Sequence, residues 1–197
     1  MRGRSLTGFA VLAILAFCCF SAKAQDKKKS NFQEVYTGTI VSMSGPMRST
    51  SFNLTIKDFT SDEDAKRYLS ILAEGDQDDL LKVIRDNDMG RLSATGTVGR
   101  SLMVARETTL PDGRIRIVAA FERWQTVAEV RGGYRSLDYP FGLMEIILDA
   151  NGKKGSGTFI AACKIDMKLD KKTGKYQLEL ENFGTYPSKV MGVMRRN

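Results

Sequence analysis

Most of the chain alternates apolar and polar residues with the period of two that is typical of half-buried β-strands. The alternating segments are rich in β-branched and aromatic residues and comprise 35–43, 52–56, 92–98, 101–109, 114–122, 143–148, 157–168, 175–183 and 188–194. Short turn sequences such as Leu110-Pro111-Asp112-Gly113 connect many of them. The pattern predicts a mainly β fold, an antiparallel barrel or sandwich of about eight to nine strands.

One region follows the helical period instead. After Ser61, apolar residues recur at three- and four-residue spacing until Gly75, and a second apolar stripe follows Asp76. Ser61 and Asp76 have the side chains that cap helix N-termini, and the acidic residues after each of them suit the helix dipole. The sequence therefore predicts a two-helix hairpin at about 61–88, inserted into the β-rich domain and covering one face or end of it.

The N-terminus has the layout of a secretory signal peptide. Arg2 and Arg4 precede an apolar run over 6–20, and small residues follow up to Ala24. The run is shorter than the roughly 20 residues that span a bilayer as a helix, although an uncleaved membrane anchor stays the alternative. We expect cleavage near Ala24, a flexible leader at 25–31, one β-rich domain at 32–197, and a secreted or periplasmic protein.

Composition then limits the chemistry. The chain of 197 residues contains no histidine, which excludes Ser-His-Asp and Cys-His catalytic centres and zinc sites that use imidazole. Cleavage near Ala24 would remove Cys18 and Cys19 and leave Cys163 as a lone thiol, which cannot form an internal disulfide. Because Cys163 lies in an apolar alternating segment, we expect it to be buried and unreactive.

Charge and loop motifs add little specific chemistry. The net charge of +7 falls to +4 once the predicted signal peptide is removed, and an exported chain with interspersed charges is not expected to bind nucleic acid. The acidic stretch 86–90 lacks the ligand spacing of an EF-hand, and the glycine-rich stretch 152–157 lacks a Walker motif. We expect no metal and no cofactor, with peripheral contact to the cell envelope as an option and the oligomeric state open.

Two places carry candidate binding groups. The first is the glycine-flanked connection over 131–142, where arginines can bind an anionic group and tyrosines offer flat apolar surface; its candidates are Arg131, Tyr134, Arg135, Asp138 and Tyr139. The alternative is that this connection only plugs one end of the sheet, with its arginines in solvent.

The second place is Glu145, which shares a strand face with Leu143 and Ile147. If this face is interior, the carboxylate needs a partner, for which Arg106, Arg114, Arg116 and Lys164 are available. Alternation does not decide the face, because Met144, Ile146 and Leu148 on the opposite side are equally apolar.

The segments 133–145, 148–152 and 181–185 resemble exported bacterial β-rich proteins of unassigned function. This resemblance covers about the C-terminal third of the chain, implies a secreted β-rich domain, and transfers no catalytic residue. The architecture is similar to that of lipocalin-like barrels, but the lipocalin glycine two residues before tryptophan is replaced by Glu122 before Trp124.

These observations favour a non-enzymatic exported protein that holds a small apolar or amphiphilic ligand in a β-barrel-like scaffold. One alternative is a histidine-free lyase or isomerase in which Glu145 or Asp138 acts as acid or base beside Tyr134 and Arg131. Another is a structural or interaction module of the envelope that binds through a sheet edge or the helical hairpin.

Overall fold

A computed structural model describes residues 33–43, 48–123, 125, 127–170, 175–184 and 186–196. The predicted signal peptide and leader lie outside these residues. The elements of the described part are β1 (Glu34–Val41), β2 (Ser49–Ile56), α1 (Asp62–Glu74), α2 (Gln77–Ile84), β3 (Gly90–Ala94), β4 (Arg100–Leu102), β5 (Val104–Thr109), β6 (Ile115–Glu122), α3 (Val127–Gly132), the 3-10 helix η1 (Arg135–Asp138), β7 (Phe141–Leu148), β8 (Lys154–Asp170), β9 (Lys175–Asn182) and β10 (Ser188–Arg196).

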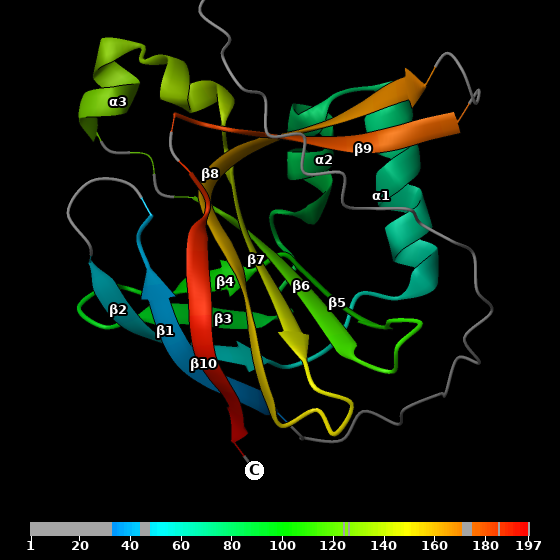
Figure 1. Ribbon diagram of the computed structural model, residues 1–197. Helices are drawn as coiled ribbons and strands as arrows, with labels where there is room; N and C mark the ends of the chain where they lie inside the picture. Colours follow the sequence, from blue (N-terminus) through cyan, green and yellow to red (C-terminus); the bar gives the residue numbers. More distant parts are fainter. Residues whose placement is uncertain are drawn as a thin grey trace, which may run out of the picture.

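The strands form one antiparallel sheet in the order β4-β3-β2-β1-β10-β8-β7-β6-β5, and β9 pairs with β8 outside this path (Figure 1). The predicted antiparallel, mainly β fold is therefore confirmed. The described part of the chain has ten strands because the expected strand over 101–109 is interrupted at Met103. Its two pieces, β4 and β5, are the two ends of the sheet. The hydrogen-bonded ladder does not close. The sheet nevertheless curls so far that its two edge strands, β4 and β5, are separated in the chain by Met103 alone.

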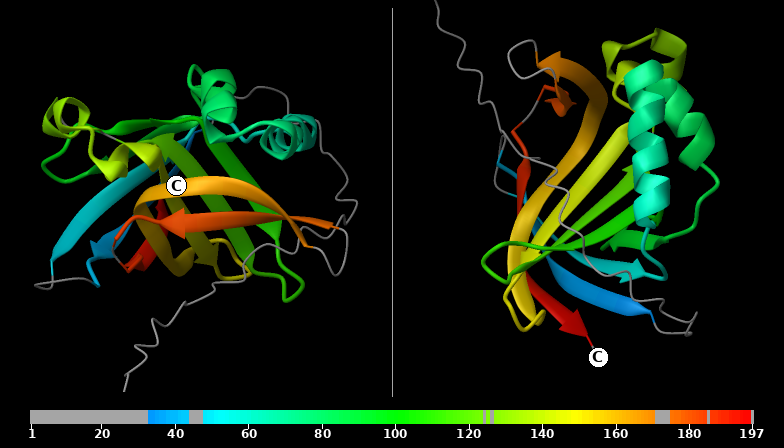
Figure 2. Two further views of the ribbon diagram at one scale, coloured as in Figure 1. Left: turned by 90° about the horizontal axis from the view of Figure 1, so that it is seen from above. Right: turned by 90° about the vertical axis from the view of Figure 1, so that its right-hand side faces the viewer.

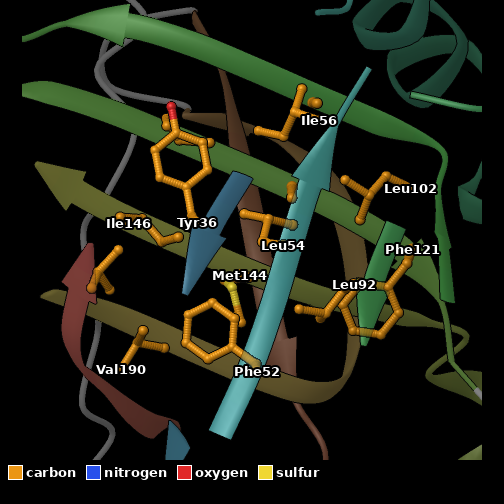
Figure 3. Packing of buried hydrophobic residues seen from close by; sticks show 14 of the residues in the cluster. Tyr36, Phe52, Leu54, Ile56, Leu92, Leu102, Phe121, Met144, Ile146 and Val190 are labelled. Carbon is orange, nitrogen blue, oxygen red and sulfur yellow. The ribbon is translucent and has the colours of Figure 1, made fainter. Parts of the chain in front are cut away.

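The concave face of this curled sheet encloses the main hydrophobic core. Its buried side chains come from β1 to β7 and from β10, and Figure 3 shows them pointing toward one another: Tyr36, Phe52, Leu54, Ile56, Leu92, Leu102, Phe121, Met144, Ile146 and Val190. Leu54 and Ile146 are completely buried. Side chains thus fill the interior of the sheet, as they do in barrels of similar strand number.

The predicted helical hairpin is present as α1 and α2. The Ser61 hydroxyl accepts a hydrogen bond from the Asp64 N–H at 3.0 Å, and the Asp76 side chain accepts from the N–H groups of Asp78 and Asp79. The two predicted N-cap residues therefore cap the two helices, and each helix begins at the next residue. The N–H of Gly75 donates to the Ile71 carbonyl and ends the first helix.

These helices cover the convex face of the sheet rather than one end of it (Figure 2). Their apolar side chains form a second core with residues of β7, β8 and the β4–β5 junction: Leu72, Leu80, Leu81, Ile84, Met103, Phe141, Cys163 and Ile165. The register between β7 and β8 shifts between Phe141 and Leu143. This bulge lets Cys163 and Ile165 share the convex face with Ile160.

Cys163 is completely buried in this second core, as expected. Burial raises the pKa of its thiol to about 12, so it stays protonated at neutral pH and is a poor nucleophile. None of the described helices has the length and apolar character needed to cross a bilayer.

The buried amide of Gln77 joins three elements. Its Nε2 donates to the Asp138 carbonyl of η1 at 2.7 Å, and its Oε1 accepts from the Ile165 N–H of β8 at 3.2 Å. Gln77→Ala leaves both backbone groups without these partners, so we expect a loss of about 2 kcal/mol in the free energy of unfolding, measured by urea denaturation. Gln33→Ala, at an exposed glutamine, is the control; equal effects of both changes would contradict the bridging role of Gln77.

Candidate functional site

The connection over 131–142 is more regular than the sequence indicated, since it begins with the last two residues of α3, contains η1, and ends in the first residues of β7. Arg131, Tyr134, Arg135 and Asp138 are exposed, whereas Tyr139 is buried. The five candidates therefore do not converge on one cleft. The structure brings together only Arg135 and Tyr139, whose side chains are hydrogen bonded.

Arg123, which the sequence analysis did not single out, holds this connection in place. Its guanidinium donates to the Tyr139 carbonyl at 2.7 Å, to the Ser136 carbonyl, and to the Glu129 carboxylate at 3.1 Å. The Ser136 hydroxyl donates to the same carboxylate at 2.7 Å. The Arg123 side chain is only 10% exposed, so these hydrogen bonds satisfy a charge that is largely withdrawn from water.

Tyr139 in turn anchors the connection between β9 and β10. Its hydroxyl donates to the Glu181 carboxylate at 2.6 Å, and its ring centroid lies 4.9 Å from that of Phe183. The hydrogen bond to Glu181, more than burial, raises the pKa of Tyr139, while Arg135 opposes the shift. Tyr139 thus has a positioning role: it fixes the segment that leads into the residues described next.

Met43, Tyr186, Pro187 and Lys189 line an open depression of about 390 Å³. Val41 at the end of β1 is the register partner of Lys189 at the start of β10, so residues just outside each strand meet at this edge. The walls come from the methionine, tyrosine and proline side chains, and Lys189 adds one cation at an exposed position. Apolar walls with one charged group are the chemistry of a site for an amphiphile. The sequence analysis selected none of these four residues.

Glu145 lies elsewhere. Its neighbours in the chain, Met144 and Ile146, point into the main core, so the Glu145 side chain is on the convex face. There it accepts a hydrogen bond from Arg116 Nε, and both side chains are less than one-fifth exposed. Arg116 was among the four expected partners. Glu145 lines neither this depression nor the one described below, and this favours a structural ion pair over an acid–base role.

A second depression, of about 310 Å³, is polar. It is lined by Arg100, Glu122, Arg123 and Gln125. Arg85 donates two hydrogen bonds to Glu122, and Arg123 is engaged by the hydrogen bonds already described. These pairings neutralise Arg85 and Arg123, and the Glu122 carboxylate also acts on the charge of Arg100, so the depression is less suited to an anionic ligand than its arginines suggest. Among the described residues, no group of three or more cysteine or acidic side chains is placed to hold a metal ion.

The structure also brings together a carboxylate, a tyrosine and an arginine that sequence reasoning missed. The completely buried Tyr36 donates its hydroxyl hydrogen to Glu34 at 2.7 Å, and Arg195 donates to the other oxygen of Glu34 at 2.7 Å. Burial, followed by the hydrogen bond to Glu34, raises the pKa of Tyr36. The tyrosine therefore stays protonated, and the three groups join the start of β1 to the end of β10.

No local signal could have revealed the contacts that join distant parts of the chain. Glu34 and Arg195 are 161 positions apart, Gln77 and Asp138 are 61 apart, and Tyr139 and Glu181 are 42 apart. Each pair depends on the folding of the whole sheet, whereas motif spacing reports only neighbours within a turn, a helix or a hairpin.

Comparison with known proteins finds no matching family model, no matching curated sequence and no matching solved structure.

Proposed function

We propose that the protein is an exported, non-enzymatic binding protein whose curled sheet presents a small amphiphile at the depression between the ends of β1 and β10. The apolar part of the ligand lies on Met43, Tyr186 and Pro187, and an anionic headgroup pairs with Lys189. The chemistry of this depression is the observation that carries the proposal.

The packing of the main core supports this position over the interior of the sheet. Core side chains from β1 to β7 and β10 occupy the concave face, and opening a ligand-sized space among them would cost the contacts that stabilise the fold. A depression at the rim requires no such loss. The anchoring of Phe183 by Tyr139 supports the same site, because it pre-forms the wall that Tyr186 and Pro187 supply.

Decanoate and 1-decanol, titrated below their aggregation limits and followed by NMR, test this proposal. We expect decanoate to bind with a Kd on the order of 100 µM, a modest affinity because an open site buries only part of a short chain. Lys189→Gln should weaken decanoate about fivefold and leave decanol unchanged, since only decanoate carries the charge. Met43→Ala should weaken both ligands about fivefold through lost apolar contact.

Met194→Ala and Lys82→Gln are matched controls. Met194 is 46% exposed and Met43 is 47% exposed, but Met194 lies outside the depression, and Lys82 is an exposed lysine on α2. Neither control should change affinity. Equal weakening by Met43→Ala and Met194→Ala, or the absence of binding by both probes, would remove the proposal.

A further inference from the structure

The last part of β8 and the whole of β9 form an arm that leaves the curled sheet (Figure 1). β9 pairs with β8, and no other described strand is its ladder partner. Its outer edge is therefore a row of backbone donors and acceptors without a strand beside it. Such an edge can accept another strand by antiparallel pairing.

The two faces of this arm differ in character. One face is apolar and contacts the helices near the base of the arm through Ile165, Met167 and Leu178. The same face is open at the far end of the arm, where Leu169 is 51% exposed and Tyr176 55%; Leu180, which pairs with Ile165 near the base, is 41% exposed. The opposite face carries charged pairs such as Lys168 with Glu179. An amphipathic ribbon with a free edge and an uncovered apolar end is a surface for association.

We propose that β9 pairs antiparallel with β9 of a second copy of this chain, with Leu178 of each copy opposite the other about a two-fold axis. This register places Tyr176 opposite the partner's Leu180, an aromatic–aliphatic pair of the kind that stabilises neighbouring strands. The Tyr176–Leu180 pair occurs twice in a symmetric dimer, and it covers two of the exposed apolar side chains of the arm.

Each of the two neighbouring registers is less favourable, for a different reason. An axis at Gln177 would place Leu180 opposite position 174, before the partner's β9 begins, so Leu180 would lose its cross-strand partner. Charge disfavours the other register. A two-fold axis at Leu178 places Glu179 opposite the partner's Gln177, whereas an axis at Glu179 would place the two Glu179 carboxylates directly opposite each other. Like charges in that position destabilise a strand pair. Both Gln177 and Glu179 are exposed. Within the arm, Glu179 pairs with Lys168, and Lys168 is also the β8 register partner of Gln177; these contacts are made in both registers and do not distinguish them.

The interface is small, because one strand pair buries less than the standard interface of about 1,600 Å². We therefore expect a reversible dimer with a Kd on the order of 10 to 100 µM, detected by sedimentation equilibrium of the processed chain. The β9 residues used in dimerisation do not line the depression at Met43 and Lys189, so failure of dimerisation leaves ligand binding untouched.

The register predicts opposite effects from two changes at one residue. Gln177→Lys brings a cation opposite the partner's Glu179 and should strengthen the dimer about fivefold, while Gln177→Glu brings a carboxylate there and should weaken it about fivefold. Both effects should shrink at high salt. Tyr176→Ser should weaken the dimer at every salt concentration.

The same two changes at the exposed Gln33, outside the arm, are the matched control and should leave the dimer constant unaffected. Circular dichroism verifies that each variant is folded. A monomer up to 1 mM, a dimer insensitive to the charge at position 177, or a dimer that Gln177→Glu strengthens would each overturn the proposal.

Discussion

Gly157→Ala is expected to destabilise the protein by about 3 kcal/mol, at the upper end of what added volume costs in a packed site. A Cβ at this residue would lie 1.8 Å from the Glu145 carbonyl oxygen of β7, and one at Gly155 would lie 2.3 Å from that of Ile147. Because the obstruction is backbone, no rotamer change can relieve it, and β7 and β8 must separate.

Urea denaturation measures this loss. Ser156→Ala is the matched control, because Ser156 lies between the two glycines and is exposed, so its effect should stay within about 0.5 kcal/mol. A wild-type midpoint for Gly157→Ala would show that β7 and β8 are not in such close contact. The glycine-rich stretch 152–157, whose last four residues begin β8, therefore has a structural role in strand packing.

Glu34→Ala is the second large effect that we expect, again about 3 kcal/mol. The substitution removes the acceptor of the Tyr36 hydroxyl and the counter-charge of Arg195. A buried polar group left without its partner loses more than the net value of the hydrogen bond. The side chain of Glu34 is 9% exposed, so water cannot readily replace it.

A double-mutant cycle with Tyr36→Phe isolates the contribution of the Tyr36–Glu34 hydrogen bond to the free energy of unfolding. Alone, Tyr36→Phe should cost about 1 kcal/mol; in the Glu34→Ala background it should cost nothing, because the hydroxyl has already lost its partner. Glu122→Ala is the control, since the Arg85–Glu122 pair is well exposed and should contribute less than about 1 kcal/mol. Strictly additive effects of Glu34→Ala and Tyr36→Phe would contradict a shared buried hydrogen bond.

The candidate site was harder to predict from the sequence than the fold. On β7, alternation could not assign a face to Glu145, because both faces of the strand are covered: Met144 packs in the main core and Phe141 in the second core under the helices. A strand buried on both sides has apolar residues in both registers, so its pattern loses the contrast that reveals the inside.

The candidates in 131–142 were selected by residue type, and residue type does not reveal how a side chain is used. Tyr139 has the amphipathic character that favours binding surfaces, but its hydroxyl is bonded to Glu181 and its ring packs on Phe183. The depression that carries the proposed function combines Met43 and Lys189, near the ends of the alternating segments 35–43 and 188–194, with Tyr186 and Pro187 from the connection before β10. Alternation within each segment does not reveal that these two ends meet, because it carries no information on which strands pair.

Local sequence patterns were sufficient to predict the secondary structure and one buried side chain: the period-two segments are strands, Ser61 and Asp76 cap the two helices, and Cys163, in an apolar segment, is buried. These features depend on neighbours within a few residues. Other features depended on the tertiary structure: the break at Met103, the face of Glu145, the partners of Gln77, the pairing of Glu34 with Arg195, and the depression beside Lys189. Each of these arises only when strands far apart in the chain pair and curl around one core, because a contact between distant residues has no counterpart in local spacing.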